Sequence, residues 1–202
     1  MARIDSLEQL RAIYGEPRER SRRKVLPALD THCRSFIALS PLLMMGTFGT
    51  DGRGDVTPRG DAPGFVEIED DRTLLIPDRP GNNRIDSLTN LIANPAVGLL
   101  FIIPGVDETL RINGSAEIRD DEALLEKFEV GAKRPATVLR VIVEEAYLHC
   151  AKAFMRSHAW DAATFLPRER LPSMGEMLRD QLGLAVAETQ PEMLERYQKT
   201  LY

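Results

Sequence analysis

The chain has 202 residues, of which 43% are apolar, and its 26 basic and 31 acidic residues give a net charge of −5. This length suits one domain, with or without an appended tail, and the apolar content is too high for a disordered protein. The mildly acidic balance argues against a nucleic-acid binder, because such proteins carry a basic excess or a basic stripe.

We expect neither a leader peptide nor a membrane span. The opening "MARIDSLEQLRAIYGEP" has no apolar core, and the longest apolar run, "AVGLLFIIP", is about half of what a membrane helix needs. The two cysteines, Cys33 and Cys150, are interpreted as buried thiols rather than as a disulfide. These features predict a reduced, soluble, cytoplasmic protein.

The first 40 residues are expected to be helical. In "DSLEQLRAIYG" the apolar residues recur at the spacing of one helix face, and Gly15 is placed to end that helix. A second helical stretch, broken at Pro27, reaches about Leu39. It contains the one basic cluster, Arg18–Lys24, which we interpret as a solvated helix face.

From Pro41 onward, alternating apolar residues and turn dipeptides predict β-strands. Three hairpins are expected in segments 42–58, 64–77 and 96–119, with turns at Asp51-Gly52, Asp70-Asp71 and Pro104-Gly105. A long strand is expected over residues 136–150, and short helices at about 83–93 and from Asp120 or Asp121. The remainder is expected to be helical, with capping-box spacing at Ser173…Glu176 and Thr189…Glu192.

Six to seven strands joined mostly by hairpins imply antiparallel pairing, which differs from the strand–helix alternation of a doubly wound fold. The predicted class is mainly β with flanking helices, built as a small closed or partly split antiparallel β-barrel. The expected divisions are a helical segment over 1–40, the barrel over 41–150, and a helical segment over 151–202 that packs on the barrel or on a partner chain.

The segment "PDRPGNNRIDSL", residues 77–88, concentrates turn residues and arginines where a strand gives way to a helix. Asn83 is predicted to cap the helix, with Asp86 three residues later. Gly81 would allow a ligand to approach the backbone closely. Arg84 would then lie in the first turn, where a cation is unfavourable unless an anion sits between it and the helix dipole. This pattern indicates a phosphate site; the alternative is an ordinary connection with Arg84 in solvent.

Other chemistry is less well supported by the residue pattern. The three histidines, His32, His149 and His158, have no metal-ligand spacing, so we expect no metal site. Arg59, in "VTPRGDAPGFVEI", follows a kink from which it could reach into a site, or it lies in an exposed turn. Lys152 and Arg156 share one helix face, either in solvent or as part of an anionic site in a second subunit.

Three segments in order, "VTPRGDAPGFVEI", "TLLIPDRPGNNRIDSLTNLIANPAVGLLFIIPG" and "ETLRINGSAEI", resemble the pyridoxamine 5'-phosphate oxidase-like family of FMN-binding split-barrel flavoproteins. The resemblance covers about residues 30–160. The tail "EEAYLHCAKAFMRS" resembles a branch other than the true oxidase. Asn83 stands where the true oxidase has a second basic residue, and no segment matches its C-terminal Trp and Arg region.

The resemblance implies a homodimer with two FMN sites at the subunit interface. It places the segment from Pro77 to Arg84 around the cofactor, with Asp78 and Arg79 near the flavin ring or ribityl chain. The residues it implies for the phosphate are Asn82, Asn83 and Arg84. Further implied contacts are Arg59, with Thr109 and Arg111 near the ring and Lys152 and Arg156 from the partner chain.

The activity implied by the resemblance is that of an FMN-dependent oxidoreductase acting on a small molecule, with NAD(P)H as a candidate donor. No catalytic residue is predicted, because hydride transfer does not require a protein acid or base. A flavin-binding sensor, store or carrier is the second hypothesis, and a β-barrel ligand-binding or nucleic-acid module is the third. We expect no nucleic-acid and no membrane partner.

Overall fold

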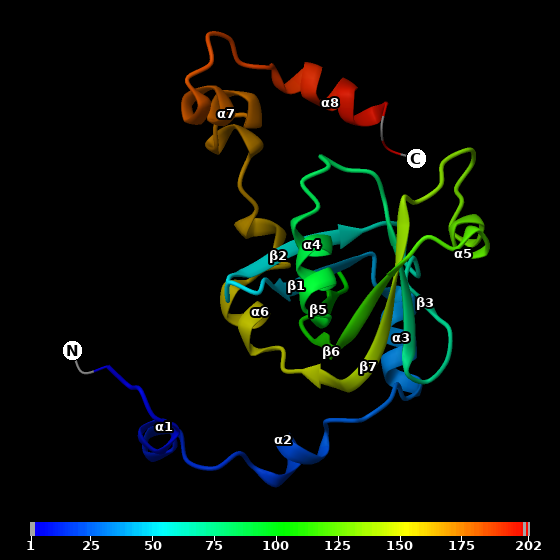
Figure 1. Ribbon diagram of the computed structural model, residues 1–202. Coiled ribbons are helices and arrows are strands. Elements are labelled where there is room, and N and C mark those ends of the chain that lie inside the picture. The colour runs from blue at the N-terminus through cyan, green and yellow to red at the C-terminus, as the bar shows by residue number, and fades with distance from the viewer. Residues whose placement is uncertain (1–2, 200, 202) are drawn as a thin grey trace.

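The computed structural model describes residues 3–199 and 201, and it is built around one seven-stranded sheet (Figure 1). The strand order is β2-β1-β5-β6-β7-β4-β3, and every neighbouring pair is antiparallel. The strands are β1 (Leu42–Phe48), β2 (Gly54–Gly60), β3 (Glu67–Ile68), β4 (Thr73–Asp78), β5 (Ala96–Ile102), β6 (Thr109–Arg119) and β7 (Thr137–His149). The predicted class, mainly β and antiparallel with flanking helices, is confirmed.

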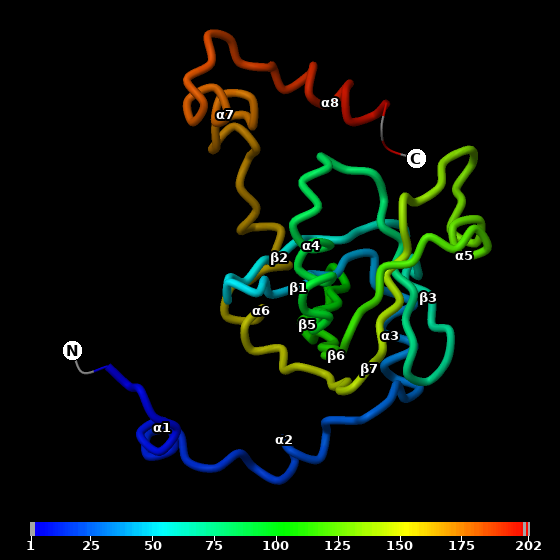
Figure 2. The backbone as a smooth tube through the Cα atoms, in the orientation of Figure 1, coloured from blue at the N-terminus to red at the C-terminus, as the bar shows by residue number. Residues whose placement is uncertain are grey.

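The helices are α1 (Leu7–Tyr14), α2 (Glu19–Arg23), α3 (Thr31–Leu39), α4 (Asp86–Ala93), α5 (Glu122–Lys127), α6 (Lys152–Ser157), α7 (Met174–Leu182) and α8 (Gln190–Gln198). Figure 2 shows that α1 and α2 extend away from the barrel, and neither has a buried residue. In contrast, α3 packs on the sheet through Cys33 and Ile37. Both predicted capping boxes, at the starts of α7 and α8, are confirmed.

The three predicted hairpins are present, and local turn chemistry explains two of them. Gly52 and Gly105 have φ of 77° and 87°, a left-handed conformation that glycine adopts without steric cost. The long β6–β7 pair is interrupted at Asn113/Gly114 by a register shift. A Cβ on Gly114 would lie 1.9 Å from the Ile142 carbonyl oxygen, so the bulge brings two backbones too close for any side chain.

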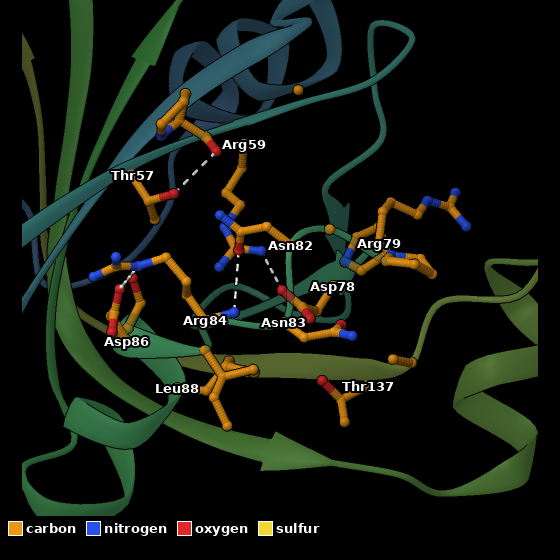
Figure 3. Close-up of a pocket in the computed structure, with 18 of the residues that line it drawn as sticks. Thr57, Arg59, Asp78, Arg79, Asn82, Asn83, Arg84, Asp86, Leu88 and Thr137 are labelled. Carbon is orange, nitrogen blue, oxygen red and sulfur yellow. Dashed lines mark hydrogen bonds and ion pairs between the residues drawn. The ribbon is translucent and has the colours of Figure 1, made fainter. Parts of the chain in front are cut away.

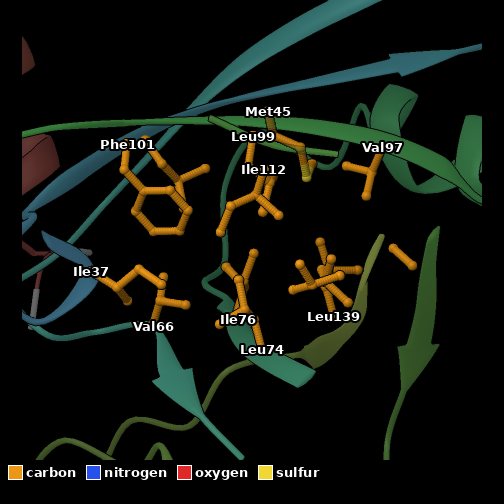
Figure 4. Packing of buried hydrophobic residues seen from close by; sticks show 14 of the residues in the cluster. Ile37, Met45, Val66, Leu74, Ile76, Val97, Leu99, Phe101, Ile112 and Leu139 are labelled. Carbon is orange, nitrogen blue, oxygen red and sulfur yellow. The ribbon is translucent and has the colours of Figure 1, made fainter. Parts of the chain in front are cut away.

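The core lies inside the curved sheet, and Ile37 of α3 packs into it near Val66 and Phe101 (Figure 4). Alternate residues of the strands point inward, as in β1, where Leu43 and Met45 are fully buried. They meet Ile37 from α3 and Phe101 from β5 in one cluster. Each such side chain stabilises the fold by about 1.5–3 kcal/mol when it is removed from water. Core packing therefore holds the sheet curved, together with the backbone hydrogen bonds between the strands.

The sheet is not closed by backbone pairing within the described residues, because β2 and β3 are its two free edges. Instead, side chains join β2 and its following residue to the end of β4. Arg59 of β2 forms an ion pair with Asp78 of β4, and Asp61 pairs with Arg79 at 3.1 Å. We call this side of the barrel, defined by these four residues, the ion-pair seam. The barrel is therefore of the split kind.

Two further predictions from the sequence, on the cysteines and on membrane spans, can be compared with the structure. Cys33 is buried, but Cys150 is exposed just after β7, so the prediction of two buried thiols is wrong for Cys150. In the part of the chain that the structure describes, no helix combines the length and apolar character that crossing a membrane would require.

Candidate functional site

A cavity of about 1020 Å³ opens at the ion-pair seam, between the end of β2 and the loop that joins β4 to α4 (Figure 3). Its size is at the upper end of the range for small-molecule sites. Residues 55–61, 77–88 and 136–137 line it, together with Phe65 and with Arg196, Tyr197 and Leu201 of the C-terminal segment. The predicted site residues that it brings together are Arg59, Pro77, Asp78, Arg79, Asn82, Asn83 and Arg84.

The loop between β4 and α4 has an unusual backbone. Asn83 and Ile85 have φ of 59° and 51°, and this left-handed region is rare for a β-branched residue such as Ile85. The Asn82 side-chain oxygen accepts a hydrogen bond from the Arg84 backbone N–H at 3.1 Å, forming a tight turn. Such conformations persist only where the surroundings impose them, and they concentrate at functional sites.

The helix begins at Asp86, not at Asn83, so the predicted N-cap role of Asn83 is wrong. Ile85 occupies the cap position and offers no side-chain hydrogen bond. Arg84 correspondingly lies before the helix, not in its first turn. The first turn of α4 lines the cavity through Asp86, Ser87 and Leu88, and its backbone N–H groups have no side-chain cap. An uncapped helix start carries partial positive charge and suits an anion.

The cationic side chains predicted from sequence are held by acids. Arg79 donates through Nε and Nη2 to Asp61 at 3.2 and 3.1 Å, and through Nη1 to the Phe128 carbonyl at 2.6 Å. Figure 3 shows it extending to the opposite side from Arg84. Arg84 Nε donates to Asp86 at 2.8 Å, in a pair whose side chains are 73% and 49% exposed. This contact raises the pKa of Arg84, whose guanidinium is charged at physiological pH with or without it.

The Arg59–Asp78 pair is much more enclosed, with side chains 19% and 13% exposed. Arg59 Nε is buried and has no hydrogen-bond partner among the described residues, and the same is true of Thr137 Oγ1. Both residues line the cavity. Because a buried polar atom without a partner costs free energy, these two atoms indicate hydrogen bonds that a ligand could complete.

The remaining predicted site residues lie elsewhere in the chain. Thr109 is buried at the start of β6, where it pairs with His149, and Arg111 follows it on an exposed position. Lys152 and Arg156 lie exposed on α6. Because β4 pairs with the beginning of β7, this group lies at the opposite end of β7 from the cavity. One chain alone does not bring it to the loop, so a role for these four residues remains a prediction about a second copy.

Basic side chains gather around Tyr147 and His149 at the end of β7 that is far from the cavity. Arg111 lies 5.8 Å from the Tyr147 ring centre and Lys24 lies 5.4 Å from it. The pKa of His149 is lowered, first by partial burial and then by the charges of Lys24 and Arg111. In the described part of the chain, no three His, Cys, Asp or Glu side chains lie close enough to hold a metal ion.

Sequence reasoning missed several residues that line the cavity. Ser87 donates to Asp55, which fixes the helix start against β2, and Thr137 begins β7 opposite Asp78. Neither residue type stands out in its segment, and only the register of β4 and β7 reveals Thr137. Tyr197 reaches the cavity from α8, more than a hundred residues after the loop, and no local pattern signals that contact.

Several solved structures are similar to part of this chain. A structure of HupZ from Group A Streptococcus is 21% identical with a TM-score of 0.47, over 59% of this chain and 93% of that one. A Clostridium acetobutylicum protein related to general stress protein 26 of B. subtilis, of the pyridoxinephosphate oxidase family, is 17% identical with a TM-score of 0.45, over 58% and 85%. General stress protein 26 from Bacillus anthracis is 18% identical with a TM-score of 0.43, over 57% and 88%. Chemistry does not transfer at such identities.

The search of curated protein sequences returned no match. The family comparison is more decisive, because the model described as pyridoxamine 5'-phosphate oxidase matches residues 29–150. That match covers more than half of the chain, from the residues before α3 to the end of β7, and it includes the loop and the ion-pair seam. The resemblance inferred from the sequence motifs is thereby confirmed, and the chain belongs to the pyridoxamine 5'-phosphate oxidase family.

Proposed function

We propose that this chain binds FMN in the cavity at the ion-pair seam and is an FMN-dependent oxidoreductase acting on a small molecule. The observation that carries the proposal is the uncapped start of α4, which faces the cavity beside Arg84. A phosphate placed there would accept hydrogen bonds from the first-turn amides and would lie against a permanent cation. Family membership supports the same cofactor class.

The donors present fit a phosphate ester. Asn82, Asn83 and Arg84 line the cavity and lie just before the helix start in the chain. Arg84 already pairs with Asp86, but that contact is exposed and contributes little, so the guanidinium can exchange the carboxylate for a phosphate at low cost. No Cβ contact would block Gly81, so the backbone there is open to a ligand.

The cavity wall away from the helix fits the uncharged part of the cofactor. Arg59 Nε offers a donor and Thr137 Oγ1 offers both a donor and an acceptor, and neither has a partner among the described residues. Asp78 holds Arg59 in place, and Asp61 holds Arg79, so both guanidinium groups are positioned before a ligand arrives. Pro77, buried at the end of β4, contributes a rigid apolar surface.

When bound, FMN would supply hydride and electron transfer, which no side chain provides. This chain would bind and orient it, and the charge of Arg59 would favour negative charge developing nearby. The proposal includes a homodimer in which Thr109, Arg111, Lys152 and Arg156 of a second copy approach the cavity. A small-molecule substrate, with NAD(P)H as a candidate donor, would enter from the open side.

One observation favours the second candidate, a flavin sensor, store or carrier without turnover. Each acid that lines the cavity already has a partner. Asp55 accepts from Ser87, and the other three acids pair with arginines: Asp61 with Arg79, Asp78 with Arg59, and Asp86 with Arg84. An acid held in this way is poorly placed to exchange protons with a substrate, which disfavours turnover that needs a protein acid or base but leaves hydride transfer to or from the flavin open. Anaerobic addition of NADH or NADPH separates the two candidates, since only an oxidoreductase reduces bound FMN faster than free FMN is reduced.

The test of FMN binding is titration followed by flavin fluorescence quenching. Arg84→Glu should raise the Kd by about tenfold or more, since a charge-assisted contact becomes a repulsion. Arg53→Glu is the matched control, because the Arg53 side chain is 89% exposed in the β1–β2 turn and, among the described residues, forms an ion pair only with Asp51 of that turn. Equal Kd values for the two variants would remove Arg84 from the site, and a wild-type protein that takes up no FMN would refute the proposal.

A further inference from the structure

The C-terminal segment supplies part of the cavity wall. Arg196 and Tyr197 of α8, and Leu201 beyond it, line the same cavity as the loop between β4 and α4. In Figure 1, α8 lies on the side of the barrel where that loop emerges. Tyr197 and Leu201 are 40% and 65% exposed, which leaves apolar surface that a ligand in the cavity could cover.

A lysine fastens this segment to the rim of the cavity. Lys133 Nζ donates to the Leu201 carbonyl at 2.6 Å and to the Lys199 carbonyl at 3.4 Å. Lys133 lies in the connection between α5 and β7, a few residues before Ala136 and Thr137, which line the cavity. The contact therefore joins the chain end to the cavity wall directly, across 66 and 68 residues of sequence.

The segment is ordered in its own right before it reaches the cavity. The Thr189–Glu192 capping box starts α8, and Met193 is buried. Arg196 donates to Glu188 through two bonds of 2.8 Å, and its guanidinium lies 4.7 Å from the centre of the Tyr197 ring. Arg196 contacts Glu188 on one side and the Tyr197 ring on the other. The orientation of Tyr197 is therefore set by contacts within its own segment.

We propose that α8 is a closing wall of the ligand cavity, in which Tyr197 and Leu201 contact the bound ligand and Lys133 holds the wall shut. The ligand takes its identity from the proposed function, on which this inference rests: a planar aromatic ring bearing a phosphate ester. With the wall in place, the bound ring is shielded from water and can leave only when the Lys133 contact opens. The segment therefore governs how long the ligand stays, while the loop and α4 hold its phosphate.

The experiment compares FMN release from four full-length proteins by stopped-flow fluorescence. Lys133→Ala and Tyr197→Ala should each release FMN about three- to tenfold faster than wild type. This factor corresponds to the loss of one hydrogen bond or one packing contact. Lys199→Ala is the matched control, because it removes one lysine charge beside the same contact, while its side chain pairs among the described residues only with Glu195, at 2.8 Å. Iodide should quench the bound flavin more strongly in the first two variants than in the control.

The outcomes separate this inference from the FMN proposal. Wild-type protein that binds FMN, with release rates unchanged in Lys133→Ala and Tyr197→Ala, would overturn the closing wall and leave FMN binding intact. If wild type binds no FMN, limited proteolysis still tests the fastening role of Lys133. Cleavage within the segment that follows residue 187 should be faster in Lys133→Ala than in Lys199→Ala. Equal cleavage of these two variants would overturn the fastening role of Lys133 without reference to any ligand.

Discussion

The Arg59–Asp78 ion pair gives the sharpest test of how the open side of the barrel is held. The two side chains are 19% and 13% exposed, and they join β2 to β4 where no backbone ladder exists in the described structure. Removing one partner from a fully buried pair costs about 3–5 kcal/mol, because the other charge is left unpaired. Since both groups keep some contact with water, we expect Arg59→Met to lower the free energy of unfolding by about 3 kcal/mol.

The double-mutant cycle distinguishes an ion pair from mere packing. Asp78→Asn should also be destabilising, because it leaves the Arg59 guanidinium enclosed without its counter-charge. The double variant leaves no unpaired charge, so its free energy of unfolding should fall by less than about 2 kcal/mol. The coupling free energy between the two substitutions should be at least about 2 kcal/mol. Asp78→Asn keeps the backbone carbonyl that accepts from Ala136 at 3.0 Å, so the strand end is preserved.

Urea denaturation followed by tryptophan fluorescence and circular dichroism measures each unfolding free energy. The control cycle uses Arg23 and Glu19 of α2, an i,i+4 pair whose side chains are 80% and 82% exposed. Its coupling should not exceed about 0.5 kcal/mol. If the losses from Arg59→Met and Asp78→Asn simply add, the seam is not held by this pair and the reasoning is refuted.

Three other predictions concern the β-bulge and the two thiols. Gly114→Ala should lower the free energy of unfolding by about 3 kcal/mol, because the new Cβ would lie 1.9 Å from the Ile142 carbonyl oxygen. Gly98→Ala is the control: its Cβ would make only ordinary contacts, so the free energy of unfolding should change by less than about 1 kcal/mol. Equal losses for the two variants in urea denaturation would contradict the close backbone approach at the bulge. Burial raises the pKa of Cys33 to about 11 from 9.0. The protonated thiol is thus favoured in the folded state, and its contribution to stability should be lost as pH rises from about 9 through about 11. At pH 8 an aromatic disulfide reagent should label exposed Cys150 quickly and Cys33 slowly, and a fast phase that survives Cys150→Ser would show this to be wrong.

The elements that sequence predicts well are those specified by adjacent residues. Gly52 and Gly105 mark their hairpins because the turns need left-handed backbone at those positions. The capping boxes of α7 and α8 place the helix starts to the residue, since both partners lie within four positions of each other. The family motifs likewise lie in continuous segments, so the fold class follows from the sequence.

The details of the candidate site depend on distant partners and were less predictable. Asn83 satisfies every local rule for an N-cap, but the loop adopts left-handed backbone at Asn83 and Ile85, so the helix starts later. The pairing of Arg59 with Asp78 joins residues 19 positions apart on strands that are not sheet neighbours. The Tyr197 contact depends on the path of the whole C-terminal segment, which no short pattern encodes.

Holding one side of the barrel by charged side chains has a mechanical consequence. Two strands joined by a backbone ladder separate only when several hydrogen bonds break together, whereas a guanidinium can trade a carboxylate for a phosphate or for water one contact at a time. The gap between β2 and β4 can therefore widen by rotamer changes at Arg59 and Arg79 while all six strand pairings persist. A ligand can therefore reach the cavity at the seam without local unfolding of the sheet, because widening this gap breaks no backbone ladder.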